Sequence, residues 1–180
     1  MAATVHVYAH TGAGPTDTNT DGLGPPRVRL KTADDTTIDT NDPIPIPTAG
    51  TKYSYWKSLT LWCSTSPTGT INNIKLFTDG SGFGTGITTY VGDETSSTYD
   101  QATGTPGDTG DEMVANHAQI NSKTDVFTYV TGSPKDVSGS INNPSTGRIS
   151  DYVVLQMDVI STASPGDLTD EDFTFRYDET

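Results

Sequence analysis

The sequence predicts an all-β protein, an antiparallel β-sandwich of the jelly-roll or immunoglobulin-like kind with about eight strands and one short helix. Its 180 residues include 32 Thr and 15 Ser but only 10 Ala and 7 Leu. β-Branched residues favour strands, and the shortage of strong helix formers excludes a helical bundle. Apolar side chains also recur at every second position in several segments, which runs of Gly, Pro, Asn, Asp and Ser separate. Residues 1–180 are predicted to form a single domain.

Three strands are expected in the first third of the chain, at 4–10, 27–31 and 53–63. The segment 4–10 alternates small aliphatic residues with His and Tyr, and 27–31 places two aliphatic residues between basic ones. In 53–63, Tyr, Leu and Cys share one face, which is typical of a strand with one side in the core. The rest of 11–52 lacks this alternation, so residues 11–52 are predicted to form a long, partly extended arm or loop region.

Five further strands are expected, at 71–77, 87–91, 125–130, 149–160 and 173–177. The strongest pattern lies within 149–160, where one face carries four apolar residues, Val153, Leu155, Met157 and Val159. A turn or two of helix is predicted at 111–120. There Asp111 and Glu112 would lie near the positive end of the helix dipole.

The charge of the chain limits its partners. Ten Lys and Arg stand against 23 Asp and Glu, which gives a net charge of −13. Such a surface repels phosphate groups and anionic lipid headgroups, because each contact would bring like charges together. Neither nucleic acid nor a membrane is therefore expected as a partner.

The cellular compartment is predicted from the first residues and from cysteine usage. The N-terminal residues include neither the basic region nor the apolar stretch of a secretory signal. The single cysteine, Cys63, excludes a disulfide within the chain. Both observations predict a protein that is made in a reducing cytoplasm.

The loop that contains Asp17, Asn19 and Asp21 is a candidate calcium site. Oxygen side chains at alternate positions, followed by Gly22, are what a hard cation needs. A helix-loop-helix site would also require a bidentate Glu six residues after the glycine, where this chain has Val28. A looser site or a solvated loop of Asx turns are the two alternatives. No other cofactor is expected.

No arrangement of residues in the sequence predicts catalysis. His6 and His10 share a strand face, but about 13 Å of strand separates them, so they cannot bind one ion. His117 is left as the candidate base, and no Gly-x-Ser-x-Gly turn places a serine nucleophile. Close pairs of carboxylates follow from the abundance of Asp and Glu. We therefore expect a protein that is not an enzyme.

Trp56 and Trp62 are candidate partner-binding residues. Both fall on the polar face of the predicted strand 53–63, among Ser and Thr. Aromatic rings in that position can stack on sugars or become buried under a neighbouring subunit. The alternative is that both rings fill a second core layer on the far side of a sheet that is covered on both faces.

Several segments resemble a group of small β-sandwich proteins encoded among the structural genes of tailed phages. The similar segments are 42–47 (DPIPIP), 50–54 (GTKYS), 71–80 (INNIKLFTDG), 153–157 (VVLQM), 161–166 (STASPG) and 173–179 (FTFRYDE). The resemblance is one of strand ends and turns, and it supplies no site residues. It implies a virion protein that assembles in the host cytoplasm, most simply a capsid decoration or cement protein. Its partners would then be the major capsid protein and neighbouring copies of itself in a symmetric assembly.

In that role Ile44 and Ile46 would be partner-binding residues. Pro43, Pro45 and Pro47 would hold them in a stiff, extended arm that loses little entropy on docking. The alternative for the arm is a connector that lies on its own sandwich. The alternative for the whole protein is a glycan- or host-binding β-module of a tail or head fibre, with the two tryptophans at its site.

Overall fold

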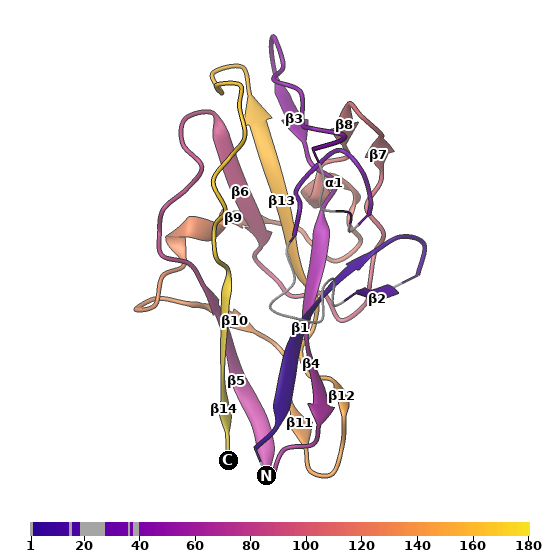
Figure 1. The fold of residues 1–180 in the computed structure, drawn as a ribbon, viewed down its shortest axis with the longest axis vertical. Helices are drawn as coiled ribbons and strands as arrows, with labels where there is room; N and C mark the ends of the chain where they lie inside the picture. The colour runs from indigo at the N-terminus through magenta and orange to yellow at the C-terminus, as the bar shows by residue number, and fades with distance from the viewer. Residues whose placement is uncertain (1, 15, 19–27, 36, 38–39) are drawn as a thin grey trace.

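The chain folds into two antiparallel sheets that pack against each other as a sandwich-like structure, shown by the computed structural model in Figure 1. The structure describes residues 2–14, 16–18, 28–35, 37 and 40–180. It confirms the predicted all-β fold, the antiparallel pairing and the lone short helix. No helix in these ranges is long and apolar enough to cross a membrane.

The larger sheet has eight strands. Its main order is β2 (Thr16–Thr18), β1 (Thr4–Thr11), β4 (Lys57–Thr65), β13 (Val153–Ile160), β6 (Ile87–Gly92) and β9 (Lys123–Asp125). Two short strands complete it, β3 (Thr51–Tyr53) beside β13 and β12 (Gly147–Arg148) beside β4. Strand β13 is central, because β3, β4 and β6 all pair with it.

The smaller sheet has four strands built around β5 (Thr70–Phe77). The others are β10 (Lys135–Val137), β11 (Ile141–Asn142) and β14 (Thr174–Glu179). Outside the two sheets lie the hairpin of β7 (Gly104–Thr105) and β8 (Thr109–Gly110), the helix α1 (Met113–Asn116) and the 3-10 turn η1 (Val126–Thr128). In Figure 1 the smaller sheet lies at the end of the molecule that holds both termini, and the larger sheet extends beyond it.

Two predicted strands are wrong. The described part of 27–31 is not a strand: its backbone makes isolated bonds, such as Tyr55 N to Lys31 O at 2.9 Å, in place of a ladder. The segment 125–130 turns into η1 because the Asp125 side chain accepts a hydrogen bond from Phe127 N at 3.0 Å. A side-chain oxygen in that position favours the start of a helical turn over the continuation of a strand.

Three other elements differ in extent, and one of them, the predicted strand 149–160, begins only at Val153 of β13. The predicted strand 53–63 is divided into β3 and β4, which run one after the other along β13 with a break at 54–56. The predicted helix is reduced to the single turn α1, where the Glu112 side chain makes no capping bond. In β5, Asn73 has a positive φ of 51° and inserts an extra residue opposite β14. This bulge lets Ile71 face the same core as Ile74 and Leu76.

The main core fills the space between the two sheets. It joins the inner residues of β4, β5 and β13, namely Leu59, Leu61, Cys63, Ile71, Ile74, Leu76, Val153 and Leu155. Each of these side chains is almost completely buried. At about 25 cal/mol per Å² of apolar surface, this burial is the principal stabilising term for the fold.

A second core lies on the opposite face of the larger sheet. It consists of Tyr55, Trp56, Ala102, Met113, Ile120 and Val154. Gln156 holds this layer in place, because its amide accepts a hydrogen bond from Met113 N and donates to Ser54 O and Asp111 O, each at 2.8 Å. Strand β13 is consequently buried on both faces, which explains why apolar residues occupy most of its positions.

Candidate functional site

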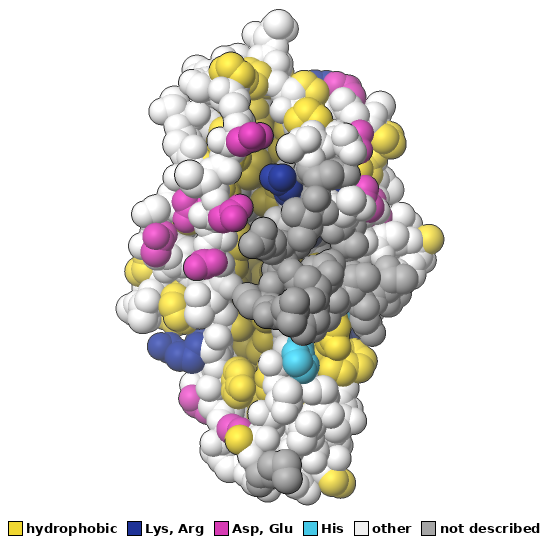
Figure 2. All heavy atoms as spheres, in the orientation of Figure 1, with side chains coloured by type: hydrophobic (Ala, Val, Ile, Leu, Met, Phe, Trp, Pro, Cys, Tyr) yellow, Lys and Arg dark blue, Asp and Glu magenta, His cyan; other side chains and the backbone are white. Residues whose placement is uncertain are grey.

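An apolar groove opens on the inner face of the larger sheet, where the smaller sheet ends. It has a volume of about 430 Å³. Its floor is formed by Ile87 of β6 and by Met157 and Val159 of β13. Figure 2 shows apolar side chains along this part of the molecule, with acidic side chains beside them.

The walls of the groove come from two irregular segments. One contains Ile44 and Ile46, and the other contains Pro165 and Leu168. Among the described residues, the large apolar side chains that remain exposed are Ile46, Ile160 and Leu168, at 37%, 42% and 37% of their surface. Two of the three line the groove, and Ile160 follows Val159 at the end of β13. Most of the exposed large apolar side chains of the described chain therefore lie at this groove.

The structure places Ile44 and Ile46 against their own sandwich. Ile44 is half-buried, Ile46 is exposed and Pro47 is buried. Of the two interpretations of the arm, the connector describes its position here. Ile46 nevertheless keeps a free apolar face at the rim of the groove, which a partner can cover.

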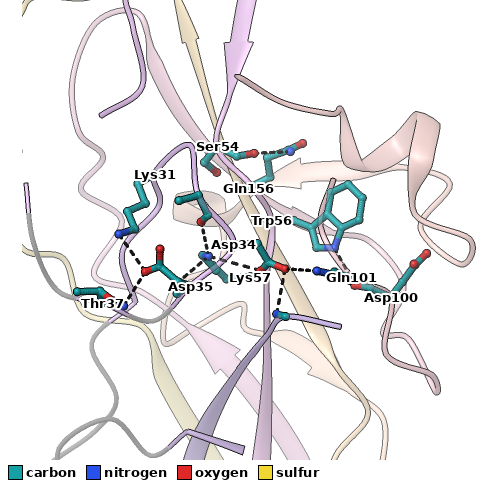
Figure 3. A network of polar contacts seen from close by, with 12 residues as sticks. Lys31, Asp34, Asp35, Thr37, Ser54, Trp56, Lys57, Asp100, Gln101 and Gln156 are labelled. Atoms are coloured by element: carbon teal, nitrogen blue, oxygen red, sulfur yellow. Dashed lines mark hydrogen bonds and ion pairs between the residues drawn. The ribbon is translucent and has the colours of Figure 1, made fainter. Parts of the chain in front are cut away.

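A buried lysine anchors the segment that leads into this arm. The Nζ atom of Lys57, at the start of β4, donates to the carbonyl oxygens of Ala33 at 2.9 Å and Asp35 at 3.0 Å. It also lies 3.9 Å from Asp34 Oδ1. The other oxygen of Asp34 accepts from Gly12 N and from Gln101 Nε2, both at 2.9 Å. Figure 3 shows how these contacts join segments that are distant in sequence.

Burial determines the electrostatics of this anchor. The Lys57 side chain is only 2% exposed. Burial lowers its pKa to about 8, and the nearby charges of Asp34 and Asp35 oppose that shift. Lys57 is therefore a cation at neutral pH whose charge is compensated by two carbonyl groups and a carboxylate. Its role in this arrangement is to fix residues 33–35 on the sheet.

Trp56 is not available to a partner, which corrects its assignment as a binding residue. It lies in the break between β3 and β4 and is 2% exposed. Its Nε1 atom donates to Asp100 O at 3.0 Å, and its ring meets His117 edge-on at 5.7 Å. The alternative interpretation, a second core layer, is the one that the structure shows for this residue.

Trp62 occupies a different environment. It lies on β4, is partly exposed and makes an edge-to-face contact with Tyr8 of β1 at 5.5 Å. His6, which is opposite Trp62 in the β1–β4 register, lies 6.4 Å from Tyr8. These three side chains form a partly exposed aromatic surface that does not include Trp56.

The calcium prediction falls mainly outside the described residues. Asn19 and Asp21 lie there, and of Asp17 the structure describes the backbone, which pairs with His10 as part of β2. Within the described ranges no group of three or more His, Cys, Asp or Glu side chains could hold a metal ion. The proposed loop site remains a prediction.

His117, the candidate base, is enclosed in the second layer. Its side chain is fully buried, and burial lowers its pKa although Asp100 acts in the opposite direction. Its Nδ1 atom lies 4.0 Å from Asp100 Oδ2 and accepts a hydrogen bond from Gln119 N at 3.2 Å. The ring packs against Trp56, so this arrangement positions a core residue.

Sequence reasoning missed both the groove and the lysine anchor. Met157 and Val159 share the predicted apolar face of their strand, but no local pattern indicates that Leu168 returns to cover them. Lys57 did carry a signal, because it is in phase with Tyr55, Leu59 and Leu61. A lysine at an inward position of a strand requires buried oxygen partners.

Comparisons of this chain with protein-family models, with curated proteins and with solved structures found no match.

Proposed function

We propose that this protein is a non-enzymatic structural component of a tailed-phage particle, a capsid decoration or cement protein. It stabilises the head by contacting the major capsid protein and neighbouring copies of itself in a symmetric assembly. The proposal places it in the virion after assembly in the host cytoplasm. The resemblance of its strand ends and turns to phage structural proteins supports this role.

The apolar groove is the observation that carries the proposal. A net charge of −13 keeps free subunits apart before assembly. In the described part of the chain, two of the three exposed large apolar side chains, Ile46 and Leu168, nevertheless line one groove. Such a surface is typical of a contact with another protein. The segment that carries Ile46 is held at its start, where Asp42 O accepts a hydrogen bond from Thr32 N at 2.9 Å, so docking orders few additional residues.

The test adds purified protein back to heads that lack it. The wild type should bind at a fixed ratio to the capsid protein and should raise the temperature at which the heads release DNA. Ile46→Asp should bind about tenfold more weakly, because it places a charge in a desolvated contact. Thr131→Asp is the matched control: it adds the same charge at an exposed position outside the groove and should bind normally.

Two results would count against this account. If the protein does not bind to heads that lack it, or if heads with and without it release DNA at the same temperature, the cement role is wrong. If Ile46→Asp binds as the wild type does, the role can stand, but the groove is not the contact.

We propose, as a second candidate function, a glycan-binding module of a tail or head fibre. The partly exposed pair of Tyr8 and Trp62 favours it, because aromatic faces stack on sugar rings. Trp62→Ala should then abolish binding on a glycan array, whereas Trp56→Phe, a change inside the second core, should preserve it. An array on which the wild type binds no glycan contradicts this function.

A further inference from the structure

One cationic and two anionic side chains meet on the outer face of the larger sheet. The Nζ atom of Lys123, on β9, lies 2.8 Å from Asp158 Oδ2 on β13 and 3.1 Å from Glu112 Oε1, just before α1. We call these residues the Lys123 cluster. Strand β6 pairs with both β9 and β13, so the lysine side chain reaches across β6 to the carboxylate.

The cluster is enclosed on the side of the lysine and the aspartate. Their side chains are 14% and 13% exposed, whereas Glu112 is 38% exposed. The ring centroids of Tyr90 and Tyr53 lie 4.5 Å and 5.3 Å from Lys123 Nζ. The amine is thus held beside two aromatic rings and the Asp158 carboxylate, with the second carboxylate at the solvent side.

The carboxyl group of Asp158 is incompletely satisfied as an ion. Its Oδ1 atom is buried and has no hydrogen-bond partner among the described residues. Burial raises the pKa of Asp158, and the contact with Lys123 only partly opposes this. A fully paired structural salt bridge would have donors on both oxygens. Asp158 therefore has one oxygen paired with Lys123 and one buried oxygen without a partner among the described residues.

We propose that Lys123 and Asp158 form an intramolecular amide bond between Nζ and Cγ, with Glu112 as the proton carrier. This goes beyond the proposed function and does not depend on it. The Nζ atom lies 2.8 Å from Oδ2 of the carboxyl group whose carbon it would attack, so the amine and the carboxyl meet without a diffusional encounter.

The reaction balances with the groups present. A proton passes from the Lys123 ammonium to the Asp158 carboxylate, which gives an amine and a carboxylic acid. The amine attacks Cγ, Glu112 accepts the second proton from Nζ and transfers it to the departing hydroxyl, and one water molecule leaves. Glu112 ends as a carboxylate, and no oxidant or other reactant is required.

The protonation state of Lys123 determines how fast the amide bond forms. Burial alone would lower the pKa of Lys123, but contacts with Asp158 and Glu112 outweigh it and raise that pKa. The ammonium is therefore the resting form, and the bond forms through the small fraction in which Asp158 holds the proton.

The bond would fasten a weak element of the sheet. Strand β9 has three residues and pairs only with β6 among the described strands. A link from β9 to the central strand β13 encloses β6 between two covalently joined neighbours. Such a link limits the fraying of a sheet edge without enlarging the core.

Intact mass spectrometry of the purified full-length chain tests the proposal. The wild type should be lighter than its sequence mass by one water molecule, and digestion should yield a peptide that joins residues 123 and 158. Lys123→Arg keeps the cation and the ion pair but should show the full sequence mass. Asp158→Asn should lose ammonia in place of water, because the leaving group changes. Glu112→Gln should fold yet form the bond far more slowly.

Two outcomes overturn it. One is a wild type at its full sequence mass after prolonged storage, which leaves an ion pair only. The other is a loss of water that persists in Lys123→Arg, because that loss must come from elsewhere, such as a succinimide at Asp79-Gly80. Circular dichroism on each variant shows that a missing bond does not reflect a failure to fold.

Discussion

Replacing Lys57 with methionine should lower the free energy of unfolding by about 3–5 kcal/mol, because it breaks a buried charge pair by removing one partner. Methionine fits the apolar path of the lysine stem but donates no hydrogen bond. The carbonyl groups of Ala33 and Asp35 and the buried Asp34 carboxylate then lose their cation. Urea titration followed by tryptophan fluorescence measures the change.

Lys52→Met is the matched control for this prediction. Lys52 pairs with Asp108 at 2.6 Å, but the two side chains are 27% and 50% exposed. Removing an ion pair at the surface should cost less than about 1 kcal/mol. If both variants lose the same free energy of unfolding, the buried pair of Lys57 stabilises the fold no more than an exposed ion pair does.

The pH dependence of the same variant provides a second readout. Burial lowers the pKa of folded Lys57 from its ordinary 10.5 to about 8, with Asp34 and Asp35 opposing the shift. Between these values the unfolded chain binds more protons at Lys57 than the folded protein does, so raising the pH stabilises the wild type. Methionine has no group that titrates in this range, so it contributes no such pH dependence. The stability gap between wild type and Lys57→Met should therefore widen by up to about 3 kcal/mol across this range. A constant gap contradicts the shifted pKa.

Replacing Gln156 with leucine should cost about 3–5 kcal/mol, because buried polar groups are left without partners. Leucine has nearly the same volume, so the cost comes from hydrogen bonds and not from a cavity. The change leaves three buried backbone groups, Met113 N, Ser54 O and Asp111 O, without their hydrogen-bond partner. The second layer should loosen first, and the amide of Met113 should exchange its hydrogen faster than amides of β4.

Gln101→Leu serves as the control for this variant. Gln101 is exposed and donates one hydrogen bond, to Asp34. Its loss should cost about 1 kcal/mol or less. If Gln156→Leu is as mild as this, the Gln156 amide does not hold the second layer on the sheet.

The strands were predictable where a single pattern decided them. In β13 the alternating Val153, Leu155 and Met157 identified both the strand and its inner face, because a strand exposes its two faces at every second residue. The segment 27–31 carried a similar pattern and failed. Its Val28 and Leu30 pack against the core from an irregular backbone, which burial alone allows.

The site was less predictable, because it depends on contacts between distant segments. The prolines around Ile44 and Ile46 indicated a stiff arm, but not that Leu168 would face it across β13. A continuous strand 53–63 places Trp56 beside Ser and Thr, which left both a surface ring and a second core layer open. The break at 54–56 and the layer that Gln156 holds changed its environment. Such a break follows from tertiary hydrogen bonds, which local sequence does not encode.

Electron cryomicroscopy of particles that carry this protein tests the central claim, that its apolar groove contacts another protein in an assembly. We predict density for the sandwich at symmetric positions on the head, with Ile46 and Leu168 covered by the neighbouring capsid protein. Particles in which the sandwich is missing from the head, or in which the groove faces solvent, would contradict the account.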